Sequence, residues 1–312
     1  MPGKRVVTVG IVQMICVDDR KLNFEKAEQL ISECAKQGAK LVCLQELSYD
    51  LYFCQEEDYD KFNLAESMDG SIHDFSSEMA RKYNLVLLAG IFERRAPGVF
   101  HNSFLIFEND GTRVGVYRKA HIPDDPSYYE KFFFTPGDDP FPVFETSAGR
   151  VGVCICWDQW YPEASRLTAM KGAEMIFYPT AIGWLAEDKT DFGASQKSAW
   201  QTMMRSHSIA NGIYVLAPNR CGTESKIEFW GSSFISDPYG NILQEANVES
   251  DEVIVQELDL SLIESARTHW PFFRDRRIDL YGDLTKRWRE DIEQPSGSQN
   301  PIVPESTGFP RR

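Results

Sequence analysis

Residues 151–163 read Val151-Gly-Val-Cys-Ile-Cys156-Trp-Asp-Gln-Trp-Tyr-Pro162-Glu163. The stretch begins with a short apolar run of the kind that forms a buried strand. Pro162 and Glu163 favour the start of a helix, because proline fits the first helical position and an acid there faces the positive end of the helix dipole. The stretch therefore predicts a strand, a sharp turn that carries Cys156, and a helix that ends near Gly172.

Strands and helices alternate along the rest of the chain. Strands are predicted over residues 6–13, 40–45, 85–92, 103–107, 113–119, 141–145, 150–155, 174–178, 214–217, 232–235, 241–244 and 252–258, and helices over 23–37, 72–82, 162–172, 196–210 and 261–267. Residues 34–42 and 168–176 echo each other as a helix end, a Gly-Ala turn and a buried strand, although such turns recur in many α/β proteins. The pattern predicts two sheets packed together with helices outside.

The chain has 312 residues, of which 42% are hydrophobic and 26% are charged. A chain of this length can bury a large core without disulfides or metals. The predicted elements follow one another without a long linker, and only the last residues are rich in Pro, Ser, Gly and Gln. We therefore predict one domain over residues 1–289 and a C-terminal tail or arm over residues 290–312.

Composition argues against several classes of partner. With 33 Lys and Arg against 47 Asp and Glu, the net charge of −14 repels phosphate backbones, so no nucleic-acid partner is expected. No apolar run approaches the length of about 18 residues that a membrane span needs, and the first residues lack a signal-peptide pattern. The seven cysteines are an odd number spread through predicted elements, which favours a reducing, cytoplasmic location without disulfides or a metal site.

Three polar residues stand where apolar strands are predicted to end: Glu46, Lys119 and Cys156. Ligands of α/β sheets bind at the carboxyl ends of strands, so these side chains could meet in one crevice. A helix N-terminus and Lys119 would lower the pKa of the Cys156 thiol, and Glu46 could take its proton. Taken singly, each residue also has an ordinary explanation, as a buried cysteine, a capping or ion-pair carboxylate and a surface lysine.

The segments around these three residues resemble the three signatures of the nitrilase superfamily. They are Leu44-Gln-Glu46-Leu, Tyr117-Arg-Lys119-Ala-His121-Ile-Pro and Cys156-Trp-Asp-Gln-Trp-Tyr-Pro-Glu163, and Thr135-Pro-Gly-Asp138 and Gly231-Ser-Ser-Phe234 are also typical of it. The resemblance covers roughly residues 5 to 285. It implies a carbon–nitrogen hydrolase of the α/β class, built as a four-layer α-β-β-α sandwich.

The resemblance also implies a catalytic role for each residue. Cys156 would be the nucleophile, Glu46 the general base, and Lys119 the group that stabilises the tetrahedral oxyanion. The family places a second glutamate soon after the lysine motif, and Glu130 matches it, although Glu130 could instead be a loop carboxylate that pairs with Lys131. The implied reaction passes through a covalent thioester and requires no metal and no organic cofactor.

Within the superfamily, further segments resemble the N-carbamoylputrescine amidases. They are Tyr49-Asp-Leu-Tyr-Phe-Cys-Gln55, Phe177-Tyr-Pro-Thr-Ala-Ile-Gly183 and Phe273-Arg-Asp-Arg-Arg277 with Leu280-Tyr281. The implied partner is a small carbamoylated amine, N-carbamoylputrescine, which a homo-oligomeric enzyme would cleave to putrescine, carbon dioxide and ammonia. A β-ureidopropionase, an N-carbamoyl-D-amino acid hydrolase, an ω-amidase and a non-enzymatic binding protein stay open as alternatives.

Charge suggests how the substrate tail would be selected. Related carbamoylases that act on amino acids carry arginines shortly after the nucleophile, whereas this chain has Gln159 and Trp160. A bidentate clamp for a carboxylate is therefore missing at that place. Glu187, Asp188 and Asp191 are expected in a loop that a cationic tail could reach, although most surface carboxylates are merely solvated.

Aromatic and histidine residues are the remaining candidates. Tyr52, Trp157 and Trp184 are candidate substrate-binding residues, or else core aromatics, and the Trp157 backbone N–H would complete an oxyanion hole. His121 and His207 invite a Cys–His dyad. We do not expect one, because a glutamate is already available as the base.

Overall fold

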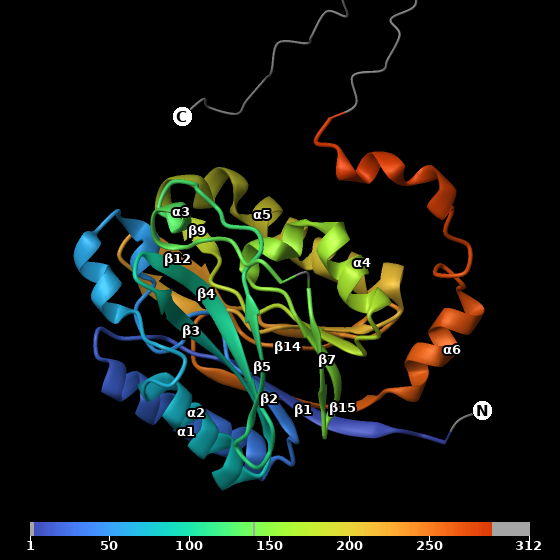
Figure 1. The fold of residues 1–312 in the computed structure, drawn as a ribbon, viewed down its shortest axis with the longest axis horizontal. Helices are drawn as coiled ribbons and strands as arrows, with labels where there is room; N and C mark the ends of the chain where they lie inside the picture. Colours follow the sequence, from blue (N-terminus) through green and yellow to red (C-terminus); the bar gives the residue numbers. More distant parts are fainter. Residues whose placement is uncertain (1–2, 140, 289–312) are drawn as a thin grey trace, which may run out of the picture. The chain divides into compact units, whose positions relative to one another are not determined.

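The computed structural model describes residues 3–139 and 141–288, and two six-stranded sheets dominate it (Figure 1). The first sheet has the order β15 (Glu252–Asp259), β1 (Val6–Gln13), β2 (Leu41–Cys43), β3 (Val86–Ala96), β4 (Val99–Phe107) and β5 (Arg113–Arg118). The second has the order β14 (Ile242–Glu245), β13 (Phe234–Ser236), β10 (Tyr214–Ala217), β8 (Met175–Phe177), β7 (Gly149–Val153) and β6 (Val143–Thr146). Both sheets pair their central strands in parallel and add antiparallel strands at the edges.

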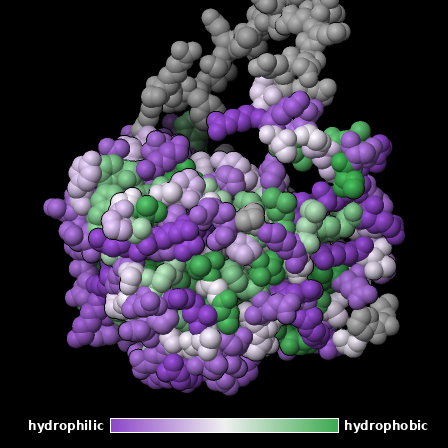
Figure 2. All heavy atoms as spheres, viewed as in Figure 1, coloured by the Kyte–Doolittle hydropathy of each residue, from purple (hydrophilic) through white to green (hydrophobic). Residues whose placement is uncertain are grey.

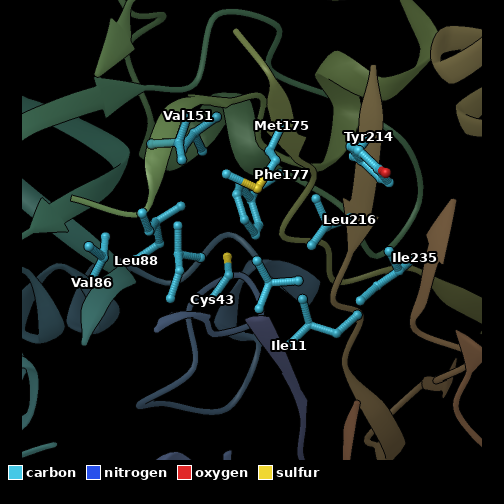
Figure 3. Packing of buried hydrophobic residues seen from close by; sticks show 14 of the residues in the cluster. Ile11, Cys43, Val86, Leu88, Val151, Met175, Phe177, Tyr214, Leu216 and Ile235 are labelled. Atoms are coloured by element: carbon cyan, nitrogen blue, oxygen red, sulfur yellow. The ribbon is translucent and has the colours of Figure 1, made fainter. Parts of the chain in front are cut away.

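The inner faces of the two large sheets pack against each other. Figure 3 shows apolar side chains of both sheets pointing toward one another, among them Ile11 and Cys43 from the first sheet and Phe177 and Leu216 from the second. All four side chains are fully buried. Because buried apolar area stabilises by about 25 cal/mol per Å², this layer supplies a large part of the folding free energy.

Helices cover the outer face of each large sheet (Figure 1). α1 (Arg20–Lys36) and α2 (Ser71–Tyr83) pack on the first sheet, and α4 (Pro162–Met170) and α5 (Ala186–Asn211) pack on the second. A short helix α3 (Glu130–Phe133) follows the first sheet in sequence, and α6 (Ser261–His269) follows β15. The layer order is α-β-β-α, which confirms the predicted four-layer sandwich.

The two echoing segments form the same local structure. α1 ends before Gly38 and α4 ends before Gly172, whose φ angles of 93° and 96° lie in the left-handed region that glycine tolerates. After each glycine the chain enters β2 or β8, which pairs in parallel with the strand that precedes the helix. The echo therefore corresponds to two matching β-α-β units, one in each large sheet.

The first predicted helix begins earlier in the structure than its apolar periodicity indicates. The prediction starts at residue 23, whereas α1 starts at Arg20. The Asp19 carboxylate accepts hydrogen bonds from the backbone N–H groups of Lys21 and Leu22, which caps the helix at the earlier position. Capping chemistry, rather than apolar spacing, therefore sets this boundary.

The start of α5 overturns one prediction about charged residues. The helix begins at Ala186 instead of residue 196, so Glu187, Asp188 and Asp191 lie on a helix. The prediction that these acids lie in a loop is therefore wrong. Most side chains between residues 186 and 191 are exposed, so this part of α5 carries no apolar period by which it could be recognised.

A third, smaller sheet does not appear among the predicted elements. It has the order β11 (Cys221–Glu224), β12 (Ile227–Trp230) and β9 (Gly183–Leu185). Each strand has only three or four residues. Runs this short, with glycine at positions 183 and 222, do not show the alternation that predicts a strand.

Residues 273–312 form a second unit of the chain, and Met1–Phe272 form the first. The described part of the second unit contains the 3-10 helices η4 (Ile278–Leu280) and η5 (Gly282–Thr285), and Arg277 pairs with Asp279. The tail predicted over residues 290–312 lies outside the described residues. One domain over residues 1–289 stays a prediction.

The surface and the cysteines are ordinary for a globular chain. Hydrophilic side chains cover most of the face shown in Figure 2, with smaller apolar patches between them. In the described part of the chain, no helix is both long and apolar enough to span a bilayer. All seven cysteines are described, buried and free of disulfide bonds. The reactivity of any one thiol therefore depends on its local contacts.

Candidate active site

Cys156 stands on a sharp turn just after a central strand of the second sheet. Beyond the end of β7, the parallel ladder continues through hydrogen bonds from Cys154 N to Phe177 O and from Cys156 N to Pro179 O, both 2.9 Å. At Cys156 φ is 41°, in the left-handed region that residues other than glycine rarely adopt. The 3-10 helix η3 (Cys156–Trp160) begins at this residue and leads into α4. The structure therefore has the predicted strand, sharp turn and helix, with one 3-10 turn in between.

Asp158 holds this turn to the first sheet. Its Oδ2 accepts hydrogen bonds from the Ile155 backbone N–H at 2.9 Å and the Tyr117 hydroxyl at 2.6 Å. Its Oδ1 accepts from the His121 backbone N–H at 3.0 Å and lies 2.7 Å from His121 Nδ1. Tyr117 lies on β5, so Asp158 joins the turn of Cys156 to the strand that ends next to Lys119.

Glu46 follows β2 in the first sheet, and its side chain is fully buried. Its Oε1 accepts hydrogen bonds from Lys119 Nζ at 2.8 Å and from Asn102 Nδ2 at 2.7 Å. Its Oε2 has no hydrogen-bond partner among residues 3–139 and 141–288. One carboxylate oxygen is therefore anchored, and the other is available to accept a proton.

Lys119 follows β5 and lies between two buried glutamates. Its Nζ donates to Glu46 Oε1 at 2.8 Å and to Glu130 Oε2 at 2.6 Å, and all three side chains are at most 1% exposed. Burial alone would lower the pKa of Lys119, but Glu130 and Glu46 more than offset this effect and hold it well above its ordinary value. The ammonium therefore stays charged, and its third N–H is left for another acceptor.

Glu130 opens α3 and binds the lysine from the other side. Its Oε1 accepts the Tyr52 hydroxyl at 2.7 Å, and its Oε2 accepts Lys119. Burial raises the pKa of Glu130 to about 7, although Lys119 opposes the rise and Glu46 adds to it. The alternative pairing with Lys131 is wrong, because the carboxylate binds Lys119 and Tyr52.

The Cys156 thiol does not have the lowered pKa that we expected from a helix N-terminus and Lys119. Burial raises the pKa of the thiol well above its ordinary value, Glu46 raises it further, and Lys119 opposes both. The resting side chain is therefore a neutral thiol, which must lose its proton as the sulfur attacks. The unpaired oxygen of Glu46 can accept that proton.

The three candidate substrate-binding aromatics lie in different places. Tyr52 reaches the charged cluster through its hydroxyl and is buried. Trp157 follows Cys156 in η3 and is half-buried. Trp184 lies on β9, and its ring packs on Trp230 of β12 with centroids 5.3 Å apart. The structure thus brings Tyr52 to the cluster and places Trp184 within the small sheet. Substrate binding by these residues stays a prediction.

Gln159 and the two histidines are engaged in other contacts. Gln159 is fully buried, its Oε1 accepts Trp200 Nε1 at 2.9 Å, and its backbone oxygen lies 2.8 Å from His207 Nε2. His121 contacts Asp158. Because both imidazoles bind groups other than the nucleophile, the geometry gives no support to a Cys–His dyad.

Asn102 and Asp158 are site residues that the sequence alone does not single out. Asn102 lies on β4, where it binds Glu46 through its side chain and Lys119 through its backbone oxygen, at 2.9 Å from Lys119 N. The available signal was a polar side chain within or beside an apolar run.

No group of three or more potential ligands in the described part of the chain is arranged to hold a metal ion.

The chain matches the family model of the carbon-nitrogen hydrolases over residues 8–268. It is 42% identical over 289 residues to an N-carbamoylputrescine amidase of Arabidopsis thaliana, a match that covers 89% of this chain and 95% of that relative. It is 41% identical over 287 residues to a citrullinase of Francisella tularensis, covering 90% of this chain and 99% of that relative. The crystal structure of a carbon-nitrogen hydrolase from Helicobacter pylori superimposes with a TM-score of 0.89 and 45% identity, covering 91% of this chain and 100% of that chain.

Proposed function

The chain belongs to the carbon–nitrogen hydrolase family, and we propose that it hydrolyses N-carbamoylputrescine to putrescine, carbon dioxide and ammonia. The observation that supports the reaction is the buried cluster of Glu46, Lys119 and Glu130, whose charges all act on the thiol of Cys156. A thiol, an unpaired carboxylate oxygen and a fixed ammonium are the groups that cleavage of a C–N bond through a thioester requires.

The first half of the proposed reaction forms a bond to Cys156. Its Sγ attacks the carbonyl carbon of the ureido group while Oε2 of Glu46 takes the thiol proton. Lys119 Nζ and the Trp157 backbone N–H stabilise the oxyanion, and each such donor is worth about 3 kcal/mol in other hydrolases. Glu46 then gives its proton to the terminal nitrogen, which leaves as ammonia, and the carbamoyl carbon stays bound to sulfur as a thioester.

The second half releases the acyl group by hydrolysis. Glu46 accepts a proton from water as the water oxygen attacks the thioester carbon. The C–S bond breaks, and Glu46 returns the proton to the Cys156 sulfur. The released carbamic acid loses carbon dioxide and leaves putrescine. Glu130 serves both halves by holding the ammonium of Lys119 in place.

The choice of substrate rests on the tail of the molecule. The N-carbamoylputrescine amidase and the citrullinase are about equally similar to this chain. Citrulline is N-carbamoylputrescine with an added carboxylate on the carbon that carries the amine. Amino-acid carbamoylases resemble this chain but carry arginines shortly after the nucleophile. This chain has Gln159 and Trp160 there, which supply no cation for such a carboxylate. This difference and the net charge of −14 favour the cationic substrate, and citrulline is the second candidate.

A substrate panel tests this proposal. Ammonia release is measured from N-carbamoylputrescine, citrulline, N-carbamoyl-β-alanine and an N-carbamoyl-D-amino acid, with a Cys156→Ala variant as the control for contaminating hydrolases. We expect kcat/KM for N-carbamoylputrescine to exceed that for the others by about tenfold or more, because a carboxylate without a cationic partner is desolvated at a cost. Activity confined to the substrates that carry a carboxylate would contradict the proposal.

We also propose that the enzyme acts in the cytoplasm as a homo-oligomer on a small carbamoylated amine, within polyamine biosynthesis. The seven buried cysteines, none of them in a disulfide bond, support the cytoplasmic part of this proposal. Analytical ultracentrifugation of the full chain tests the oligomeric part, and a monomer at all concentrations would contradict it.

A further inference from the structure

Arg220 is a fully buried arginine that binds the loop after Glu46. It lies in the segment between β10 and β11, directly before β11, and its side chain is 0% exposed. Its Nη2 donates to the carbonyl oxygens of Glu46 at 3.2 Å, Leu47 at 2.7 Å and Asp50 at 3.2 Å, and its Nη1 also reaches Asp50 O at 3.2 Å. One guanidinium therefore binds three backbone carbonyls of the segment that begins with the carboxylate assigned as the base.

Glu224 extends this contact to the other end of the loop. Its Oε1 accepts Arg220 Nη1 at 2.6 Å, and its Oε2 accepts the backbone N–H of Tyr52 at 2.6 Å. The Tyr52 hydroxyl in turn binds Glu130. The pair of Arg220 and Glu224 thus binds residues 46–52 at both ends, next to Glu46 and next to the tyrosine that orients Glu130.

Two observations indicate that this pair serves geometry. At Leu47 φ is 48°, a left-handed conformation that a branched residue keeps only where its surroundings fix it. An ion pair that is at most 3% exposed adds little net stability, because the loss of hydration opposes the attraction between the charges. A planar guanidinium can bind several carbonyl oxygens in fixed directions, which a lysine ammonium does not do.

We propose that Arg220 is a positioning residue, which together with Glu224 fixes residues 46–52 so that Glu46 and Glu130 flank Lys119 at hydrogen-bond distance. This inference rests on the proposed function, in which Glu46 moves the proton and Glu130 holds the ammonium. A displaced loop would lengthen both contacts to Lys119. The pair therefore acts on the chemical step and touches neither substrate nor the reacting atoms.

The test compares kcat and KM among variants of this pair. Arg220→Gln removes both the positive charge and the planar, forked guanidinium group. The double variant Arg220→Gln with Glu224→Gln leaves no buried charge unpaired, so it keeps the test usable if the single variant fails to fold. Arg220→Lys keeps the positive charge but lacks the forked guanidinium group. Arg20→Lys is the matched control, because Arg20 binds the side chain of Asp50 in the same loop, at 2.6 and 2.9 Å, and not its backbone.

We expect the folded Arg220 variants to lose kcat by about tenfold to a hundredfold with KM within about threefold of wild type, because a small misplacement of catalytic groups acts on the reacting geometry. Arg220→Lys should recover only part of this loss, and Arg20→Lys should stay within about twofold of wild type. A wild-type kcat in the double variant, or an equal loss in Arg20→Lys, would overturn the inference.

A crystal structure of the double variant gives a readout that needs no substrate. We expect the separation of Glu46 Oε1 and Lys119 Nζ to exceed the present 2.8 Å and the backbone at Leu47 to change; an unchanged loop would overturn the inference. Glu46→Gln separates this inference from the proposed function. Turnover by Glu46→Gln contradicts the proposed function. If Glu46→Gln is inactive but the Arg220 variants keep a normal kcat, only the positioning role is contradicted.

Discussion

At the scale of single residues, one ammonium is shared by two buried carboxylates. Lys119 binds both Glu46 and Glu130, and none of the three side chains is more than 1% exposed. Charges in such a dry site interact far more strongly than in water. Burial raises the pKa of Glu130 to about 7, so this carboxyl changes charge near neutral pH. Its ionisation therefore sets the pH range over which Lys119 is held from both sides.

Tyr52→Phe tests this dependence on pH. The Tyr52 hydroxyl binds Glu130 and lowers the pKa of that carboxyl, so its removal raises the pKa above 7. If ionised Glu130 is needed, activity falls as the pH drops through this pKa, and the variant should lose activity at a higher pH than wild type. A hydrogen bond to a charged group is worth about 1.5–3 kcal/mol, so we expect the acid limb of kcat/KM to rise by about one pH unit or more.

Tyr49→Phe is the control for this pH profile. Tyr49 is equally buried, but its hydroxyl lies 3.3 Å from Ser76 Oγ and does not bind the cluster. Its removal should leave the acid limb unchanged. An acid limb in Tyr52→Phe that stays in place or moves to lower pH would show that Glu130 does not control this step.

Sequence motifs predict that Glu46 and Lys119 meet, because each follows an apolar strand of the first sheet, and the two side chains do form an ion pair. Arg220 could not be found in this way. Its partner Glu46 is 174 residues away, and what it binds is a backbone carbonyl, which carries no side-chain signature. Such contacts depend on how the loops of the two sheets pack, and not on local spacing.

At the scale of elements, Asp158 joins β5 to the turn that carries Cys156, and Asp158→Asn tests this junction. In Asp158→Asn one carboxylate oxygen becomes an NH2 group, which cannot accept the hydrogen bonds that Tyr117 and Ile155 now donate to Oδ2. We expect the free energy of unfolding to fall by about 1–3 kcal/mol, and kcat to fall as the turn shifts. Urea unfolding and ammonia release measure the two effects.

Asp251→Asn is the matched control for this change. Asp251 also accepts a backbone N–H, from Ile15 at 2.6 Å, but the contact is solvent-exposed. We expect its unfolding free energy and kcat to stay close to those of wild type, because water replaces an exposed hydrogen bond. If Asp158→Asn were as mild as this control, the side chain would not be what holds the turn.

Element types were more predictable than element ends. The buried strands and the apolar stripe of α1 follow from periodicity, which reports burial. The ends of helices depend instead on single polar contacts such as the Asp19 cap, or on exposed turns such as the start of α5 at Ala186. In the small sheet, β9 is held by pairing with the distant strand β12, so its own residues carry little signal.

At the scale of the whole chain, both large sheets contribute to one site. Glu46 and Lys119 follow strands β2 and β5 of the first sheet, whereas Cys156 follows β7 of the second. The proposed chemistry therefore requires the two sheets to keep their packing. This explains why a fold with a large apolar layer between the sheets suits a site that must hold three buried charges.

Ionic strength tests the role of the overall charge. A chain with a net charge of −14 should attract a cationic substrate at long range, and salt screens this attraction. We expect kcat/KM for N-carbamoylputrescine to fall as NaCl is raised, whereas kcat should change little. Citrulline, which has no net charge, is the control and should show a flatter dependence. A kcat/KM that is flat or rises with salt for the cationic substrate would contradict electrostatic attraction.

The most direct test of the proposed reaction is to trap the covalent intermediate on Cys156. The wild-type enzyme is mixed with N-carbamoylputrescine, quenched in acid during turnover and digested for mass spectrometry. We predict an adduct on the peptide that contains Cys156, with the mass of the substrate less ammonia, and no adduct in Cys156→Ala. Turnover by Cys156→Ala, or an adduct on another residue, would contradict the account.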